Sequence, residues 1–298
     1  MARVSRILGR IALGLLILIV LLVGVVYALS ARALGETYPD PGTTLRVSTD
    51  SATVARGEHL FQAVLSCVVC HGEDAGGKVF AEMGPIGTGV GANLTRGAGG
   101  VGAEYTTQDY VRAIRHGIRK DGTSLLIMPS EIYANLSDAD LGAVVAYIQQ
   151  LPPVDRTVPR TSLKPLGRAL LAFGALPMLT APKVERKPPA APVAPDSTAA
   201  YGAYLVGVGG CTGCHGADLS GGEPVGPPGS PAPPNLTPAG IGDWTQADFF
   251  RAIREGKRPD GRTLNEMMPW KEYGKMTDLE LTAIWRYLHS LPERPTVR

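Results

Sequence analysis

Cysteine, net charge and strand-like patterning are all scarce in this sequence. Only four of the 298 residues are cysteine, and the formal net charge at pH 7 is +2. A nearly neutral chain lacks the basic excess of proteins that bind nucleic acids, which excludes that class. No convincing run of alternating apolar and polar residues predicts a β-sheet. The first 33 residues contain no cysteine, which excludes a lipid anchor on a thiol there.

Glycine and proline, in contrast, are abundant. The chain has 37 glycines and 25 prolines, yet 44% of its residues are apolar. That combination indicates long loops between packed elements rather than disorder. The length is sufficient for two ordinary domains.

The N-terminal segment predicts a membrane anchor over residues 1–33. Ile11–Leu29 carries no charge and has about the length that a helix needs to cross a bilayer. Arg3, Arg6 and Arg10 precede it, which places the N-terminus in the cytoplasm and the rest of the chain on the other side. Ala31–Ala33 offers a signal-peptide cleavage pattern, but the apolar stretch is longer than usual for one, so we expect an uncleaved anchor. Residues 34–52 are predicted to form an extended tether between the anchor and the first domain.

An internal repeat occupies most of the remaining chain. Tyr105–Gly122 matches Trp244–Gly261, and Ile127–Leu141 matches Met267–Leu281. We therefore predict one domain at residues 53–160 and a second copy at 199–298. Residues 161–198 combine an apolar segment with a proline-rich linker. The apolar segment is too short to span a membrane and is expected to pack on a domain or to lie at the membrane surface.

Both copies carry the same helix signals, so the predicted fold class is all-α. Each has a glycine in the helix before its cysteines, which would let another helix cross closely. Each also has a capping-box pair at the start of a later helix and a glycine at that helix's end. These residues are Gly57, Thr106, Asp109 and Gly117 in the first copy, and Gly202, Thr245, Asp248 and Gly256 in the second. A final helix begins at Ser137 or Thr277 and ends before a Leu-Pro pair.

All four cysteines lie in two C-x-x-C-H motifs, one in each copy. The motif residues are Cys67, Cys70 and His71, and Cys211, Cys214 and His215. This spacing is the attachment signature of c-type haem, with the histidine as proximal iron ligand. A disulfide framework would not require a histidine after each pair, and a thioredoxin-like site would need a strand–helix context. A shared zinc site would have to join pairs 144 residues apart.

The second axial ligand of each iron is predicted to be a methionine. Met128 and Met268 occupy matching positions, and each is followed by proline. Methionine is more often core filler, but recurrence of the Met-Pro pair favours ligands. Met267 is the rival of Met268, and Ile127 stands at its position in the first copy, so Met268 is preferred.

Several other polar residues invite two interpretations. Arg115 and Arg254 repeat, and either pair with haem propionates or are solvated helix charges. Asn93 and Asn235 also repeat, and either form turns or donate toward haem. His59, His116 and His289 have no histidine counterpart, which favours surface or helix-face roles.

The order of helix, C-x-x-C-H, loops, Met-Pro and closing helix resembles class I cytochrome c, twice. The stretches PNLTPAGIGDWTQADFFRAIREG and MMPWKEYGKMTDLEL resemble multi-haem cytochrome c subunits of bacterial membrane-bound alcohol, aldehyde and sugar-acid dehydrogenases. In that branch a separate catalytic subunit oxidises the substrate. Those subunits typically carry three C-x-x-C-H motifs and this chain has two, which leaves its partner open.

The resemblance implies a di-haem cytochrome with two covalently bound haem c groups. It would be single-pass in the bacterial cytoplasmic membrane, with lipid around its N-terminal helix and both haem domains periplasmic. Its redox partners would be a donor, a dehydrogenase or quinol-oxidising complex, and an acceptor: an oxidase, a soluble cytochrome or a photosynthetic centre. Six-coordinate irons leave no substrate position, so we expect electron transfer rather than catalysis. The alternative is a di-haem enzyme such as a peroxidase or thiosulfate dehydrogenase.

Overall fold

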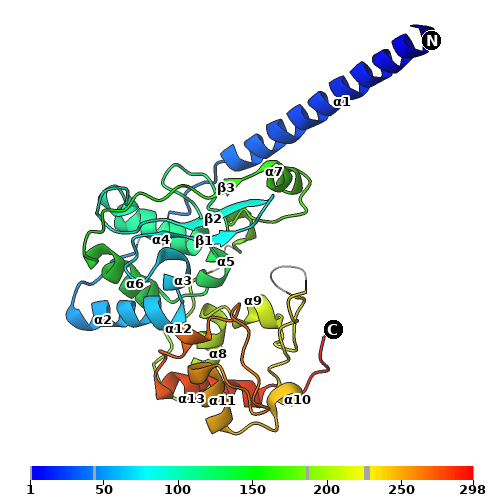
Figure 1. Ribbon diagram of the computed structural model, residues 1–298. Coiled ribbons are helices and arrows are strands. Elements are labelled where there is room, and N and C mark those ends of the chain that lie inside the picture. The colour runs from blue at the N-terminus through cyan, green and yellow to red at the C-terminus, as the bar shows by residue number, and fades with distance from the viewer. Residues whose placement is uncertain (1, 43–44, 186–187, 225–228, 298) are drawn as a thin grey trace.

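The computed structural model describes residues 2–42, 45–185, 188–224 and 229–297. A long helix, α1 (Ala2–Gly35), projects from a body made of two helical domains (Figure 1). The predicted tether and linker lie partly outside the described residues, at 43–44 and 186–187.

Helix α1 has the properties of a membrane span. Within Arg3–Gly35 its most apolar window has a mean hydropathy of 3.0 and is 0% buried. It is the one helix in the described part of the chain that is long and apolar enough to cross a bilayer. In water such a surface would be unfavourable, because every leucine and isoleucine from Ile7 to Leu29 stays exposed.

The two domains repeat the same order of helices. The first domain contains α2 (Ser51–His59), the π-helical turn η1 (Leu60–Val64), α3 (Val68–His71), β1 (Lys78–Glu82), β2 (Gly87–Gly91), η2 (Val101–Ala103), α4 (Thr107–His116), α5 (Ser130–Tyr133) and α6 (Asp138–Gln150). The second contains α8 (Ala199–Val208), α9 (Cys211–His215), α10 (Pro238–Ile241), α11 (Gln246–Glu255), α12 (Trp270–Tyr273) and α13 (Asp278–Ser290). Between them lie β3 (Ser162–Leu163), α7 (Pro165–Ala172) and η3 (Ala181–Lys183).

A close helix crossing forms the centre of each domain, as the repeated glycines predict. Helix α2 packs on α6, and α8 packs on α13. A methyl group on Gly57 would overlap the carbonyl oxygen of Ala143, and one on Gly202 would overlap that of Ala283. Glycine is therefore required at both crossings, because backbone atoms of the facing helix leave no room for a side chain.

The predicted caps of α4 and of its counterpart α11 are confirmed. Thr106 with Asp109 and Thr245 with Asp248 form complete capping boxes at the starts of α4 and α11. Gly117 and Gly256 end these helices, each with a φ of 66° in the left-handed region. These local signals fix the helix ends before any tertiary contact is considered.

A small sheet in the first domain was not predicted. Strands β1 and β2 form an antiparallel hairpin, and β2 also pairs with the two-residue strand β3 in the order β1-β2-β3. The prediction of helices alone is therefore incomplete. Strand β2 reads GTGVG, which carries no alternating apolar pattern, and its partner β3 lies about 70 residues later, so no local signal announces the sheet.

The apolar segment before the linker packs on the first domain. The backbone N–H of Ile127 donates to Met178 O at 3.0 Å, and Thr180 N donates to Leu125 O at 3.0 Å. The hydroxyl of Thr180 donates to Met128 O at 2.9 Å. The segment therefore covers the Met-Pro turn of the first domain, which fulfils the expectation that it packs on a domain.

The two domains share one continuous apolar core and contact each other reciprocally. Buried residues of both belong to the same cluster, among them Phe61 and Val64 of the first and Tyr201 and Leu205 of the second. Turn η1 of the first domain contacts α12 of the second. In return, α8 of the second domain contacts α5, the first-domain counterpart of α12. Because corresponding elements meet in both directions, the interface resembles the isologous contact of a two-fold dimer.

Candidate functional site: two haem-attachment motifs

Each C-x-x-C-H motif forms a single helical turn that begins after a left-handed residue. Ser66 precedes Cys67 with a φ of 50°, and Gly210 precedes Cys211 with a φ of 79°. Glycine adopts this conformation freely, whereas serine does so at a cost, so Ser66 is a strained position beside the motif. After each histidine, Gly72 and Gly216 turn the chain away with φ values of 83° and 84°.

The four motif cysteines are free thiols. None forms a disulfide, although each pair lies within one helical turn. Burial raises the pKa of Cys67 to about 12 and that of Cys211 to about 11, and it also raises the pKa values of Cys70 and Cys214. In the described part of the chain, no group of three or more His, Cys, Asp or Glu side chains is arranged to hold a metal ion.

Each motif histidine is held by a backbone carbonyl. Nδ1 of His71 lies 2.8 Å from Ala92 O, and Nδ1 of His215 lies 2.8 Å from Pro234 O. A carbonyl oxygen only accepts hydrogen bonds, so Nδ1 carries the proton and Nε2 keeps its lone pair. Burial lowers the pKa of both imidazoles, against the opposing effect of this bond, which favours the neutral form that binds iron.

The two Met-Pro turns have the same geometry. Pro129 and Pro269 have φ and ψ of −83° and 56°, and −78° and 51°. Ser130 N donates to Met128 O at 2.9 Å, and Trp270 N donates to Met268 O at 2.8 Å. Both methionines pack against the core, whereas Met267 is 56% exposed. This difference supports Met268 over its rival as the candidate ligand.

A repeated tyrosine that sequence reasoning missed ties each Met-Pro helix to its motif. The hydroxyl of Tyr133 donates to Leu65 O at 2.9 Å, and that of Tyr273 donates to Gly209 O at 2.6 Å. In both domains the acceptor is the second residue before the first motif cysteine. Burial raises the pKa of both phenols, with the neighbouring motif cysteines contributing. The signal was present in the sequence, since the two tyrosines occupy matching positions of the repeat.

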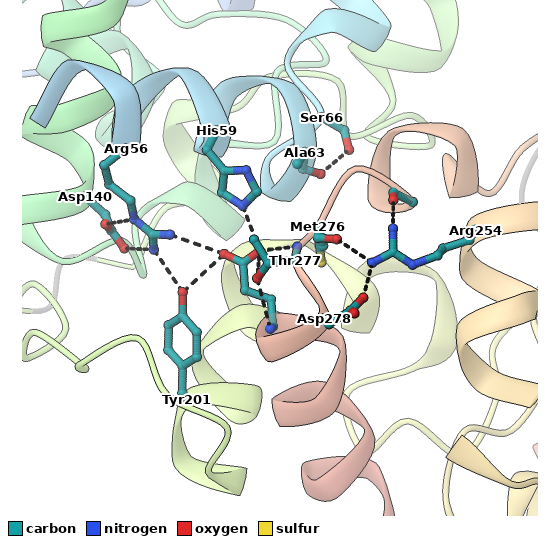
Figure 2. Close-up of polar contacts among 12 residues, drawn as sticks. Arg56, His59, Ala63, Ser66, Asp140, Tyr201, Arg254, Met276, Thr277 and Asp278 are labelled. Carbon is teal, nitrogen blue, oxygen red and sulfur yellow. Dashed lines mark hydrogen bonds and ion pairs between the residues drawn. The ribbon is translucent and has the colours of Figure 1, made fainter. Parts of the chain in front are cut away.

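Each of the repeated arginines pairs with a carboxylate of its own domain. The guanidinium of Arg115 donates to Asp138 at 2.6 Å and to Leu136 O at 2.9 Å, and this residue is only 3% exposed. Arg254 makes the same contacts with Asp278 and Met276 O at 2.6 and 3.1 Å (Figure 2). Arg115 thus joins α4 to the start of α6, and Arg254 joins α11 to the start of α13. These contacts give both arginines a structural role, and the propionate interpretation stays a prediction.

The repeated asparagines form turns and hold the chain after the final helix. Asn93 Oδ1 accepts from the backbone and hydroxyl of Thr95, and its amide donates to Val154 O at 2.7 Å and to Arg156 O at 3.1 Å. Asn235 does the same with Thr237 and with Arg294 O, at 2.8 Å. Both amide hydrogens of Asn93 are used within the protein, so this amide does not donate toward haem.

His59 lies at the interface between the domains rather than on an open surface. Its Nε2 is 2.7 Å from Oε2 of Glu280 in α13 (Figure 2). Arg56 reaches Glu280 at 3.2 Å and Asp140 of its own domain at 3.0 Å. The hydroxyl of Tyr201 accepts from Arg56 at 3.1 Å. The surface interpretation of His59 is therefore wrong, because the domains dock on this helix.

The geometry fits covalently attached haem c in both domains. The two thiols are free and lie on one turn, and the adjacent imidazole presents a neutral nitrogen. Gly91 and Gly222 lie so close to the carbonyls of Cys70 and Cys214 that a methyl group on either would overlap them. The backbone at Gly91 and at Gly222 therefore packs directly on the second cysteine of each motif.

Comparison with protein families identifies both domains. Residues 52–148 match the family model of cytochrome c oxidase, cbb3-type, subunit III, and residues 199–292 match that of cytochrome c.

Similar proteins extend over most of the chain. It is 31% identical over 281 residues to the fructose dehydrogenase cytochrome subunit of Gluconobacter japonicus, which covers 87% of this chain and 55% of that protein. It is 30% identical over 294 residues to the alcohol dehydrogenase (quinone) cytochrome c subunit of Gluconacetobacter polyoxogenes, covering 90% and 60%. The gluconate 2-dehydrogenase cytochrome c subunit of Pantoea cypripedii is 40% identical over 104 residues, covering 33% and 23%.

The chain thus spans little more than half the length of the first two relatives. Both matched regions are cytochrome c-type domains, and each contains one haem-attachment motif. It belongs to the c-type cytochromes and is a di-haem cytochrome c, with two cytochrome c-type domains and two sites for covalently bound haem c.

Proposed function

We propose that this chain is a membrane-anchored electron relay of a dehydrogenase-type respiratory complex. The observation that carries the proposal is the matched pair of histidines, each fixed by a carbonyl at 2.8 Å with Nε2 left as a ligand. The similar proteins are cytochrome subunits of fructose, alcohol and gluconate dehydrogenases, which supports a dehydrogenase as the electron donor. A quinol-oxidising complex is the other donor class, and the acceptor is an oxidase, a soluble cytochrome or a photosynthetic centre.

The protein's own residues hold and insulate the cofactors. Haem c supplies one-electron chemistry at its iron when it is bound. Cys67 and Cys70, and Cys211 and Cys214, would attach the haem groups, and His71 and His215 would each supply a nitrogen ligand to the iron. Met128 and Met268 would supply the thioether ligands, which as neutral groups would favour a higher reduction potential than a second histidine.

The N-terminal helix supplies the anchor. Arg3, Arg6 and Arg10 precede the apolar run of α1, which favours a cytoplasmic N-terminus and periplasmic haem domains. Because α1 is 0% buried in its most apolar window, lipid is the environment that this surface suits. The resulting location is a single pass through the bacterial cytoplasmic membrane.

Spectroscopy of the full-length holoprotein tests the ligand assignment. We expect two haems per chain, both low-spin with methionine–iron charge-transfer absorption in the ferric form. His71→Ala and His215→Ala should each remove the low-spin signal of one haem, whereas the matched control His289→Ala should retain both. A high-spin ferric haem in the unaltered protein would instead favour the di-haem enzyme alternative.

Membrane assays test the donor. Membranes that contain the chain should show reduction of its haems when alcohol, fructose or gluconate is supplied to an intact complex. Detergent extraction should then co-purify a dehydrogenase subunit with the chain. Haem reduction that requires added quinol, and is unaffected by these substrates, would contradict the dehydrogenase assignment and favour the quinol-oxidising donor.

A further inference from the structure

Helix α7 lies where the membrane helix joins the first domain, on the face of the body from which α1 leaves (Figure 1). Nη1 of Arg168 donates to Ser30 Oγ at 3.1 Å. The same guanidinium lies over the ring of Tyr27, 5.0 Å from its centroid. Both partners are at the end of the apolar run Ile11–Leu29, so α7 is fixed at the height where α1 would leave the bilayer.

A second side of α7 is fixed to the first domain. Gly167 packs so tightly on the carbonyl of Ile86 that a methyl group would overlap it, and Leu171 is only 8% exposed. Lys164 N donates to Ile86 O at 2.9 Å, just before the helix begins. The position of α7 is therefore set on two sides, against the body and against α1.

The remaining side of α7 is apolar and partly open. Leu166 and Leu170 of α7 and Phe173, the residue that caps its C-terminus, follow one another at the i, i+4, i+7 spacing, and Leu170 is half-buried. Leu166 is 44% exposed and Phe173 73%, the largest exposed fraction among the large apolar side chains of the described residues. A single exposed leucine needs no explanation, but an apolar helix face beside an exposed apolar span indicates a contact surface.

We propose that α7 is a second membrane contact, an interfacial helix whose Leu166, Leu170 and Phe173 face the acyl chains. The proposal rests on the membrane anchoring proposed for α1, because the face is continuous with the end of that span. Tyr27 is 40% exposed beside it, and amphipathic aromatic rings concentrate at membrane interfaces. Basic residues flank this face, as in other helices that lie in the interface. Arg168 is held by Ser30 and Tyr27, and Nζ of Lys164 donates to Gly84 O at 2.9 Å.

A second contact would restrict the orientation of the haem domains. A single helix as anchor lets the body rotate about the helix axis and tilt. With α7 held in the interface, the first domain keeps one face on the membrane, and the second domain follows because it docks on the first. Partners would then meet a fixed face of the protein.

Photocrosslinking of the full-length holoprotein tests this contact. Benzoylphenylalanine replaces Phe173 in protein reconstituted into vesicles of phosphatidylethanolamine and phosphatidylglycerol. The matched control carries it at Leu279, which is 41% exposed on α13 of the second domain. We expect lipid adducts at position 173 by mass spectrometry, several-fold above those at position 279.

Three results would overturn the proposal: no adduct at position 173, adducts to protein instead of lipid, or equal lipid adducts at both positions. Flotation of the same vesicles separates this contact from the anchor. Protein that floats with the vesicles but gives no lipid adduct at 173 refutes only the role of α7. Protein that does not float refutes the anchoring by α1, and with it this contact.

Discussion

The imidazole Nε2 of His59, in the first domain, lies 2.7 Å from Oε2 of Glu280 in the second. The hydroxyl of Tyr204, in the second domain, donates to Oδ2 of Asp140 in the first, also at 2.7 Å. His59 and Tyr204 occupy matching positions of the repeat, as do Asp140 and Glu280. The same contact is therefore made twice across the interface with different side chains, as an approximate two-fold relation requires.

Replacing Glu280 should destabilise the docked pair of domains. This carboxylate is 2% exposed and accepts from Arg56, His59, Tyr201 and Thr277. Glu280→Gln removes a buried charge from Arg56, so we expect the free energy of unfolding to fall by about 2–4 kcal/mol. Chemical denaturation followed by circular dichroism and haem absorbance measures the change.

The control for this variant is Glu266→Gln. Glu266 pairs with Lys271 at 2.9 Å, but its side chain is 74% exposed. Solvent screens such a pair, so the expected loss is less than about 1 kcal/mol. Equal losses in the two variants would show that the interdomain cluster does not contribute as proposed.

Acid should remove the contribution of Glu280. Burial alone would raise its pKa, but hydrogen bonds from His59 and Thr277 N, together with the charges of His59 and Arg56, lower the pKa to about 2. Since an unfolded glutamate titrates near about 4.3, the stabilisation is complete above about pH 5 and is lost as the pH falls through about 2. Denaturation at a series of pH values should show the difference between the wild type and Glu280→Gln shrinking over that range. A difference that stays constant down to about pH 2 would refute this origin.

Two glycines of the same helix should respond oppositely to alanine. In α8, a methyl on Gly202 would overlap the carbonyl oxygen of Ala283, whereas one on Gly207 would meet nothing within 4 Å. We expect Gly202→Ala to lower stability by about 3 kcal/mol, because a facing backbone cannot yield. Gly207→Ala should raise stability by about 0.5–1 kcal/mol through reduced entropy of the unfolded chain. Thermal unfolding of the two holoproteins compares them, and a stable Gly202→Ala protein would contradict the close crossing.

Spectroscopy of alanine variants should distinguish the roles of the adjacent residues Met267 and Met268. Met268→Ala should abolish the methionine–iron charge-transfer absorption of one haem and lower its midpoint potential, since the neutral thioether ligand is lost. Met267 is 56% exposed, so Met267→Ala should leave both properties unchanged. A redox titration of each variant distinguishes them. The reverse result would transfer the ligand role to Met267.

Comparison of the two copies in the sequence predicts the helical framework well. Capping pairs such as Thr106 and Asp109 act within a few residues, so the positions where α4 and α11 begin can be read locally. Gly57 and Gly202 also indicate the helix crossings, since the same small residue recurs inside an apolar helix. The sheet escapes prediction because its strands are glycine-rich and its third strand is only two residues long.

Identity of a residue between the two copies of the domain predicted the roles of polar side chains only in part. It left Arg115 and Arg254 open between haem propionates and solvated helix charges, but both are engaged with Asp138 and Asp278 within their own domains. It passed over His59 because its counterpart is a tyrosine, although both residues make the same contact across the domain interface.

The haem-attachment motifs are five consecutive residues each, so the sites of covalent haem attachment can be recognised from the sequence without knowledge of the fold. The contact of His59 with Glu280 joins residues 221 positions apart, and that of Arg168 with Ser30 joins residues 138 apart. Such pairs form only when packed helices bring distant segments together and bury their polar groups. The docking of the two domains, and the place of α7 beside α1, are therefore properties of the folded molecule.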